Sequence, residues 1–248
     1  MRRNILITGA SSGLGAGMAR EFAARGHHLA LCARRTDRLD ALRAELLAKY
    51  PRLAIHVRAL DVRDHAQVFT VFRAFDEDLG GLDRVIVNAG MGKGQPLGTG
   101  RFDANLQTAE TNFVSALAQC EAALELFRKR GHGHLVTISS IAGIRGLPRN
   151  STIYSATKAG LTTLSEGVRA ELYGTDIKVT TILPGYIDTE INAGRARRPF
   201  VVDCETGCRA IVRAIEREPA TASVPRWPWG PIGFLLRRLP LRVIAKLA

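Results

Sequence analysis

A tyrosine and a lysine stand four residues apart in a stretch of helical character, at Tyr154 and Lys158. Residues at this spacing share one face of a helix, so the ammonium can lie beside the phenol. A free phenol has a pKa of about 10, and a neighbouring positive charge lowers it, which makes tyrosine a usable acid or base near neutral pH. Upstream, Ser139 and Ser140 follow the apolar run 135–138. A serine there can donate a hydrogen bond to a substrate oxygen that gains negative charge during a reaction, although helix capping and core hydroxyls are common alternatives.

A glycine-rich turn reads T-G-x-x-x-G-x-G over residues 8–15, between an apolar run at 5–7 and a helical stretch at 14–25. Its glycines, Gly9, Gly13 and Gly15, allow a sharp turn and a close approach to a pyrophosphate. The helix N-terminus that follows supplies free N–H groups and partial positive charge. A turn without a ligand is the alternative, but the position after the first strand of an alternating chain favours a dinucleotide cofactor.

The end of the second apolar run bears on which nucleotide binds. An NAD site carries an acidic residue there, about 20 residues after the glycine turn, to bind the ribose hydroxyls. Here Ala33 takes that place, and Arg34 and Arg35 follow. A guanidinium matches a 2′-phosphate, which favours NADP(H) over NAD(H), with Arg34 the better candidate ligand. The alternative is that the arginines cap a solvated helix, and the nearby Asp37 argues in the other direction.

Short apolar runs alternate with longer helical stretches along most of the chain. We expect strands at 5–7, 29–32, 54–57, 84–87, 135–138 and 178–183, and helices at 14–25, 36–49, 64–79, 152–173 and in a long stretch that ends near residue 130. Six such units predict a single α/β domain over residues 1–248, with a doubly wound parallel sheet and helices on both faces. Ligands bind beyond the C-terminal ends of the strands in this architecture.

Composition sets limits on the class of protein. The chain has 248 residues, 46% of them hydrophobic, and its longest stretch without Asp, Glu, Lys or Arg is the 16 residues 4–19. A membrane-spanning helix needs about 20 apolar residues, and no signal peptide fits the N-terminus, so a cytoplasmic protein is expected. The cysteines (Cys32, Cys120, Cys204 and Cys208) have no framework spacing and are expected to be small buried thiols. Cys204 and Cys208 stand one helical turn apart, but a metal site is disfavoured because no histidine is near.

The formal net charge of +12 is unevenly distributed, because residues 191–248 contribute eleven Lys/Arg against four Asp/Glu. Nucleic acid is one partner of such a chain, but no binding motif accompanies the charge and aromatic residues are only 6%. An anionic cofactor, an anionic substrate or a membrane surface explains the charge at least as well.

Taken in order and spacing, these motifs resemble the short-chain dehydrogenase/reductase family of roughly 250 residues, over residues 4–190. The resemblance rests on residues 8–15, Asp61-Val62, Asn88-Ala89-Gly90, Asn112, Ser140, Tyr154, Lys158 and Pro184-Gly185-Tyr186-Ile187-Asp188-Thr189. It implies a Rossmann fold, a small-molecule carbonyl or alcohol substrate, no metal, and a homodimer or homotetramer.

The resemblance also implies roles for individual residues. Ser140 would hold the substrate oxygen, Tyr154 would be the general acid or base, and Lys158 would lower the phenol pKa and bind the nicotinamide ribose. Asn112 would position a proton-relay water. The implied cofactor residues are Gly9, Ser11, Ser12, Gly13, Leu14, Gly15, Arg34, Arg35, Asp61, Val62, Asn88, Ala89, Gly90, Tyr154, Lys158, Pro184, Gly185, Ile187 and Thr189. Asp61 and Val62 would contact the adenine, and Ile187 and Thr189 the carboxamide. Ser12 stands where NADP-preferring members usually have a basic residue, so the preference rests on Arg34 and its neighbour.

Two segments near the C-terminus depart from a regular pattern. Residues 188–203 fall where the family has its substrate lid, and Arg195, Arg197 and Arg198 there could meet an anionic substrate or form a solvated cluster. The tail, 225–248, carries Trp227, Trp229 and five cations. Such a segment is typical of an interfacial membrane contact. Packing against a sister subunit is the alternative that we favour.

We therefore expect an NADP(H)-dependent reductase of a ketone or aldehyde, with a substrate that could be lipid-like or anionic. The rival interpretation is a catalytically silent NADP(H)-binding sensory or membrane-surface protein. The presence of Ser140, Tyr154 and Lys158 together favours the enzyme.

Overall fold

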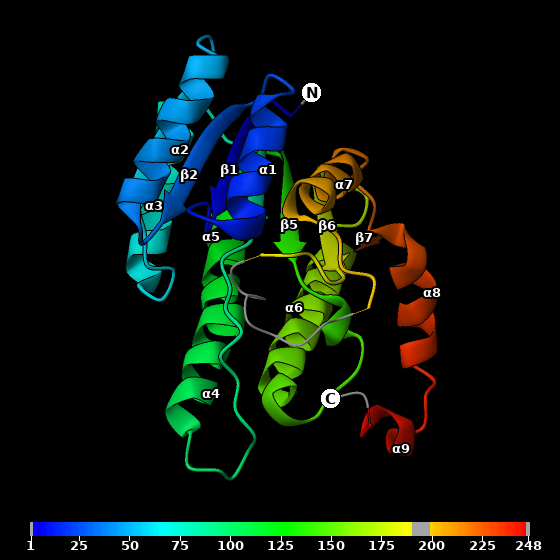
Figure 1. Ribbon diagram of the computed structural model, residues 1–248. Helices are drawn as coiled ribbons and strands as arrows, with labels where there is room; N and C mark the ends of the chain where they lie inside the picture. The colour runs from blue at the N-terminus through cyan, green and yellow to red at the C-terminus, as the bar shows by residue number, and fades with distance from the viewer. Residues whose placement is uncertain (1, 190–198, 247–248) are drawn as a thin grey trace.

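The computed structural model describes residues 2–189 and 199–246, and their centre is one parallel β-sheet (Figure 1). The seven strands follow the order β3-β2-β1-β4-β5-β6-β7 across the sheet. They are β1 (Asn4–Thr8), β2 (His28–Ala33), β3 (Ile55–Ala59), β4 (Arg84–Val87), β5 (His132–Ile138), β6 (Asp176–Pro184) and β7 (Thr221–Val224). All six adjacent pairs are parallel. The predicted doubly wound α/β fold is confirmed.

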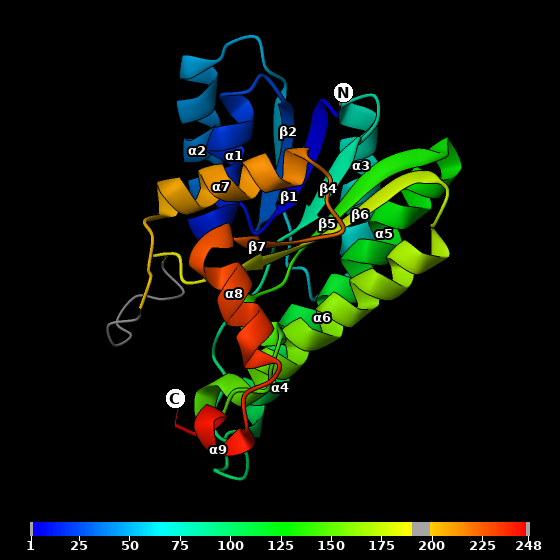
Figure 2. The same cartoon turned by 90° about the vertical axis from the view of Figure 1, so that its right-hand side faces the viewer.

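Helices cover both faces of this sheet (Figures 1 and 2). One face carries α1 (Gly13–Ala23), α2 (Thr36–Lys49) and α7 (Cys204–Glu216); the other carries α3 (His65–Asp78), α5 (Ser115–Arg130) and α6 (Thr152–Glu171). The central strand shows why both faces are apolar: Ile5 and Ile7 pack under α1, whereas Leu6 between them packs on the opposite side. All three side chains are fully buried, as expected for a strand covered on both faces.

The predicted long helix is interrupted by one wider turn. α4 (Phe102–Ala109) runs into a π-helical turn, η1 (Glu110–Val114), and then into α5. Such turns insert a residue into the α-helical register and are frequent at functional sites. The turn holds Asn112 at 1% exposure.

The expectation of six strands is wrong by one. β7 pairs with β6 in parallel register from Thr181↔Thr221 to Pro184↔Val224. It is the last strand in the sheet order, and its sequence T-A-S-V is short and half polar. β4 is equally short, but its sequence R-V-I-V contains an apolar run, whereas the T-A-S-V of β7 lacks the hydrophobicity that marks the other strands.

The tail folds back onto its own chain. It forms α8 (Arg226–Leu236) and α9 (Leu241–Ile244), joined to the body by the buried side chains of Trp229 and Ile244. The Trp229 ring meets the Tyr186 ring edge to face, with 5.1 Å between centroids. Within the described ranges, no helix is long and apolar enough to cross a membrane.

The cysteines agree with the expectation of buried thiols in three of four cases. Cys32, Cys120 and Cys208 are buried, and Cys204 is half-buried. The Cys204 and Cys208 sulfurs lie 3.8 Å apart on α7. In the part of the chain that the structure describes, no group of three or more His, Cys, Asp or Glu could hold a metal ion.

Candidate active site

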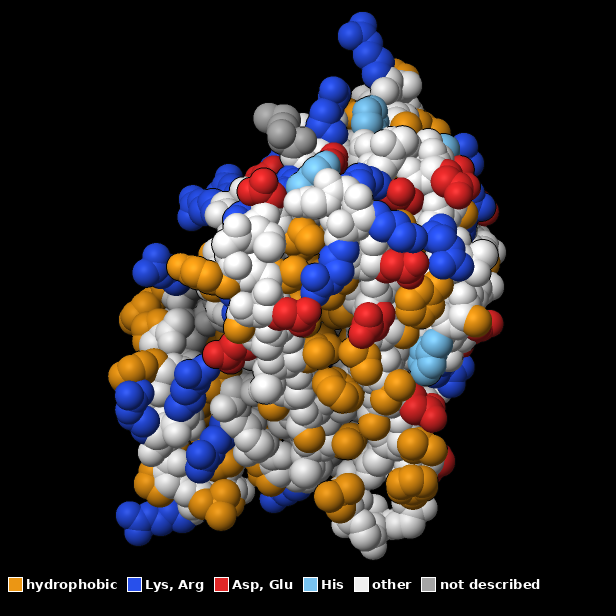
Figure 3. All heavy atoms as spheres, turned by 180° about the vertical axis from the view of Figure 1, so that it is seen from behind, with side chains coloured by type: hydrophobic (Ala, Val, Ile, Leu, Met, Phe, Trp, Pro, Cys, Tyr) orange, Lys and Arg blue, Asp and Glu red, His pale blue; other side chains and the backbone are white. Residues whose placement is uncertain are grey.

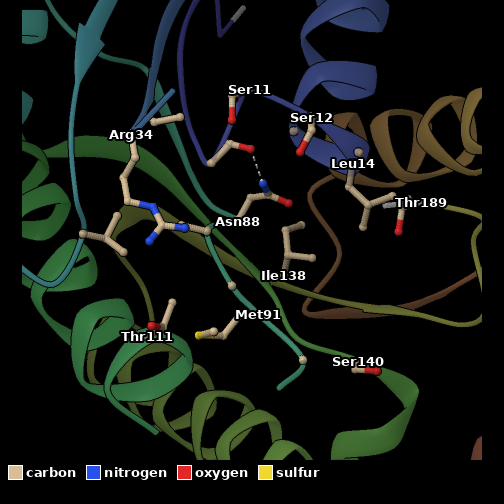
Figure 4. Close-up of a pocket in the computed structure, with 18 of the residues that line it drawn as sticks. Ser11, Ser12, Leu14, Arg34, Asn88, Met91, Thr111, Ile138, Ser140 and Thr189 are labelled. Atoms are coloured by element: carbon tan, nitrogen blue, oxygen red, sulfur yellow. Dashed lines mark hydrogen bonds between the residues drawn. The ribbon is translucent and has the colours of Figure 1, made fainter. Parts of the chain in front are cut away.

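A cleft of about 620 Å³ opens beyond the C-terminal ends of the strands. The sheet order reverses beside β1, whose neighbours β2 and β4 lead the chain away in opposite directions, and such a switch point is where doubly wound sheets bind ligands. Every predicted catalytic or cofactor residue lines the cleft except Asn112. Figure 4 shows Ser11, Ser12, Arg34, Asn88, Ser140 and Thr189 around it.

The glycine turn forms a backbone cradle at one end of the cleft. Gly9 has φ +65°, and a Cβ there would lie 2.9 Å from the Ala89 Cα. A Cβ at Gly15 would overlap the carbonyl oxygen of Gly9. α1 then begins with an extended Ser12 whose side chain makes no capping hydrogen bond. The first N–H groups of a helix have no partner within it, so this end of the cleft suits a phosphate group in both shape and charge.

Asn88 ties the glycine turn to β4. Its side-chain amide donates to the Thr8 carbonyl oxygen at 2.8 Å, and its backbone N–H donates to the Thr8 hydroxyl at 3.0 Å. The Ala89 N–H donates to the same hydroxyl at 3.1 Å. These bonds fix the spacing between the ends of β1 and β4, which is the mouth of the cleft.

Two arginines at the end of β2 make the cleft basic. Arg34 is exposed and lines the cleft. Arg35 crosses to the glycine turn, where it donates to the Ser12 hydroxyl at 2.7 Å and to the Ser11 hydroxyl at 3.2 Å. The turn itself has no basic residue, but Arg35 places a guanidinium beside Ser12 across the fold. The sequence analysis did not predict this contact between Arg35 and Ser12, because the two residues are far apart in the chain and the parallel pairing of β1 with β2 brings them together.

A third arginine, which the sequence analysis did not single out, lies beside Asp61. The Arg63 guanidinium donates to the Asp61 carboxylate at 2.7 Å. This hydrogen bond holds the pKa of Asp61 below its usual value, and Arg34 adds a smaller effect in the same direction. Asp61 therefore stays ionised, and its charge is offset by Arg63 on the wall of the cleft.

The residues with reactive chemistry meet at the ends of β5 and α6. Lys158 is 5% exposed, and its ammonium donates to the Ile138 carbonyl oxygen at 2.8 Å. Burial lowers the pKa of Lys158 to about 8. The ammonium lies 5.9 Å from the centre of the Tyr154 ring. The predicted i, i+4 pairing on one helix face is therefore present.

Ser140 and Ser139 have different surroundings. The Ser140 hydroxyl oxygen accepts from the Ala142 N–H at 3.1 Å, which caps a short 3₁₀ turn, η2 (Ile141–Gly143). Because this bond uses the oxygen as acceptor, the hydroxyl hydrogen can still be donated into the cleft. Ser139 is 3% exposed and donates to the Lys158 carbonyl oxygen at 2.9 Å. Ser139 thus supports the helix that carries Lys158.

Asn112 lies behind the cleft wall. Its side chain accepts from the Met91 N–H and donates to the Met91 carbonyl oxygen, both at 2.8 Å. It also donates to the Thr157 hydroxyl at 3.4 Å. Asn112 therefore fixes the loop after β4 against α6.

Further lining residues were not among the predicted catalytic and cofactor residues, although the sequence analysis noted Ala33 and Ser139. They are Ala33, Leu60, Arg63, Met91, Gly92, Lys93, Gln107, Thr111, Ile138 and Ser139. Met91, Gly92 and Lys93 belong to the loop after β4, whose place at the switch edge was the one signal that could have pointed to them.

The segment after β6 forms the opposite wall. Pro184, Gly185, Ile187 and Thr189 line the cleft, and Thr189 lies next to Gly13 of the glycine turn. The Trp229 ring packs so closely on Gly185 that no side chain would fit there. The cluster Arg195, Arg197 and Arg198 lies outside the described residues. The adjoining part of the proposed lid is held by a parallel bridge between Ile187 and Val202.

A comparison with family models covers the segment that carries the glycine turn, Tyr154 and Lys158. A model of the short chain dehydrogenase family matches residues 3–199. The chain belongs to the short-chain dehydrogenase/reductase family. Its fold and its membership of this family, both predicted from sequence, are confirmed, and it is an oxidoreductase of the short-chain type.

Relatives of this short-chain dehydrogenase/reductase cover most or all of its length. An uncharacterized oxidoreductase of Mycobacterium tuberculosis is 54% identical, covering 100% of this chain and 98% of that protein. An uncharacterized oxidoreductase of Myxococcus xanthus is 37% identical, covering 90% and 87%.

Solved structures share the fold. An alcohol dehydrogenase from the archaeon Thermococcus sibiricus, complexed with 5-hydroxy-NADP, is 25% identical with a TM-score of 0.79, covering 90% of this chain and 95% of that chain. A short-chain dehydrogenase/reductase from Burkholderia phymatum, in complex with NAD, is 20% identical with a TM-score of 0.83, covering 98% and 94%. Proteins with this fold thus bind either nucleotide.

Proposed function

We propose that this short-chain dehydrogenase/reductase is an NADP(H)-dependent reductase of ketones or aldehydes. The observation that carries the proposal is the position of Lys158, buried beside Tyr154 in a cleft that Ser140 and the glycine cradle also line. A nicotinamide nucleotide bound there supplies the hydride.

The residues present fit such a nucleotide. The cradle at Gly9 and Gly15 has room for backbone to approach a pyrophosphate but no room for a Cβ. Preference for a 2′-phosphate is supported by Arg34, by Arg35 beside Ser12, and by the absence of a carboxylate at Ala33. Asp61 does not oppose this choice strongly, because Arg63 pairs with it.

The chain's own residues handle the proton. Tyr154 gives its phenolic proton to the substrate oxygen, and Ser140 donates a hydrogen bond to the same oxygen as its charge grows. The ammonium of Lys158 stabilises the phenolate that Tyr154 leaves behind. Asn112 acts through the backbone of Met91 and holds the cleft wall in place.

We also propose that the carbonyl compound has an apolar body. Met91 and Ile187 line the reacting end of the cleft, and Trp229 backs the wall at Gly185. Exposed apolar side chains on the helices beside the cleft, Leu106, Val114 and Leu117, suit the homodimer or homotetramer that the family resemblance implies.

The deciding experiment measures NADPH oxidation over a panel of carbonyl compounds that includes long-chain and coenzyme A-linked ketones. In parallel, the Kd of NADPH is measured for the wild type and for Tyr154→Phe. We expect the variant to lose turnover by about 10²-fold or more while its Kd for NADPH stays within about three-fold. Turnover that survives in Tyr154→Phe would remove the assigned acid. Tight NADPH binding by a wild type that turns over no member of the panel would instead support a silent NADPH-binding protein.

A further inference from the structure

The outer surface of α8 and α9 combines exposed apolar side chains with cations. We call it the C-terminal face; it consists of Arg226, Trp227, Phe234, Leu235, Arg237, Arg238, Leu241, Arg242, Val243 and Lys246. Trp227 is 77% exposed, Leu241 73% and Phe234 63%. Figure 3 shows hydrophobic and basic side chains side by side along the edge where these helices lie, at the lower left.

This face is part of the folded body. Trp229 and Ile244 are buried on the inner side of the same two helices. Gly233 packs against Ile144 of the loop after Ser140, and the Arg145 guanidinium donates to the Leu239 carbonyl oxygen at 3.3 Å. The inner side of α8 and α9 is thus already packed on the body of the protein, and the exposed apolar side chains lie on the outer side of these two helices.

The charge of the face has one sign. After Glu218 the sequence contains no acidic residue, whereas the face contains five cations. Arg238 lies over the Phe234 ring, 3.8 Å from its centre, so a cation and an aromatic ring share one patch of surface. The occupant must accept apolar side chains and supply negative charge.

These requirements exclude a second copy of the same face as a good partner. In a two-fold dimer a patch meets itself, so five cations would face five cations with no carboxylate between them. An anionic lipid surface supplies negative headgroups for the cations and an acyl boundary for Trp227, Phe234 and Leu241. We propose that the C-terminal face docks on the surface of an anionic lipid bilayer. This binding is independent of the proposed reductase activity, because no residue of the face lines the cleft.

The test is co-sedimentation of the full chain with vesicles of phosphatidylcholine alone or with phosphatidylglycerol. The variant is Arg237→Gln/Arg238→Gln/Arg242→Gln. The matched control is Arg43→Gln/Arg52→Gln/Arg73→Gln, which removes three exposed cations at α2, the turn after it and α3, at the other end of the sheet from α8 (Figure 1). Both variants have the same net charge.

We expect wild type to bind anionic vesicles, to bind neutral ones weakly, and to dissociate as salt rises. Each cation near such a surface contributes roughly a five-fold factor, so the C-terminal variant should lose binding by at least tenfold and the control by less than threefold. The chain has two tryptophans, of which Trp229 is buried. Binding should therefore protect Trp227 from a water-soluble quencher, and Trp227→Phe should abolish that change.

Equal losses in the two variants would overturn the proposal in favour of non-specific charge, as would the absence of binding to anionic vesicles. A dimer that the C-terminal variant dissociates, without vesicle binding, would assign the face to a second copy. Turnover of a water-soluble ketone by the C-terminal variant should match wild type, so failure here and failure of the reductase proposal give different results.

Discussion

Lys158 is an ammonium placed almost wholly out of solvent. Burial disfavours the charged form, and the hydrogen bond to the Ile138 carbonyl oxygen recovers part of that cost. The buried ammonium thus lowers the stability of the folded protein, and it places a positive charge beside Tyr154. Sites of this kind are where function and stability oppose each other.

The buried lysine predicts a pH dependence of stability in the protein without cofactor. Its pKa is about 8 when folded against 10.5 ordinarily, so between these values the unfolded chain binds a proton that the folded chain has lost. The free energy of unfolding contributed by Lys158 therefore rises from pH 8 to about 10.5, by roughly 3 kcal/mol. Denaturant unfolding of wild type and Lys158→Met at pH 7.5 and 10.5 should show wild type gaining on the variant. Parallel changes in both proteins would contradict this.

Arg34 should distinguish the two nucleotides. In Arg34→Ala we expect the Kd of NADPH to rise by about tenfold or more and that of NADH by less than about threefold, because the lost charge-assisted hydrogen bond involves only the 2′-phosphate. Fluorescence titration of both nucleotides measures this. Arg43→Ala, an exposed arginine of α2, is the control and should change neither. Equal losses of NADPH and NADH affinity would refute the assignment.

At the scale of elements, the features that could be predicted from the sequence are those that depend on a local pattern of residues. The strands with continuous apolar runs, the glycine turn and the Tyr154–Lys158 spacing were all readable, because each depends on residues close together along the chain. β7 was missed since four half-polar residues carry little signal. Arg35 beside Ser12 and Arg63 beside Asp61 required side-chain directions that spacing does not give. The fold of the tail could not be predicted, because it depends on the contact between Trp229 and Gly185, which are far apart in the sequence.

The glycine turn should tolerate no side chain at its tightest point. In Gly15→Ala the new methyl group would overlap the Gly9 carbonyl oxygen and approach the Ala10 Cα to 2.9 Å, both backbone atoms that cannot move aside cheaply. We expect loss of NADPH binding by at least about tenfold and a lower melting temperature. Isothermal titration and thermal unfolding test both expectations.

The control for that change is a helical glycine in open space. Gly167 is exposed within α6, and a Cβ there meets no atom within 4 Å. Gly167→Ala should raise the free energy of unfolding by about 0.5–1 kcal/mol and leave NADPH affinity unaltered. A weaker NADPH affinity in this variant would show that helix backbone changes act on the site indirectly.

At the scale of the whole molecule, an ionic cluster lies near the N-terminal ends of the central strands, at the opposite end of these strands from the cleft. Arg84 of β4 is 2% exposed and donates to the His134 ring at 2.8 Å and to Glu218 at 3.1 Å. Burial lowers the pKa of His134 well below its ordinary value. The neutral ring accepts from Arg84 and donates to the Thr180 hydroxyl, which donates to the Pro219 carbonyl oxygen. The cluster therefore joins β4, β5, β6 and the turn before β7.

Removing the acid from this cluster should destabilise the fold. Glu218→Gln leaves the buried Arg84 without its counter-charge, and since Glu218 is one-quarter exposed we expect a loss of about 2 kcal/mol in the free energy of unfolding. Glu125→Gln is the control, because its partner Lys129 is solvent-exposed and such pairs contribute about 0.5 kcal/mol. Urea unfolding measures both. Similar small losses in the two variants would show that water replaces the Glu218 carboxylate as the partner of Arg84.

The strand order also fixes when the parts of the site can exist during synthesis. The first three strands to leave the ribosome form one flank of the sheet, in which β1 pairs with β2 on one side but has no partner on its other side until residues 84–87 of β4 have emerged. The hydrogen bonds of Asn88 and Ala89 to Thr8, which brace the start of the glycine turn, form only after that strand. Lys158 and the wall at Gly185 come later still. The complete cleft therefore exists only after about three-quarters of the chain has been translated, and until β4 emerges the unpaired edge of β1 is open to pairing with other chains.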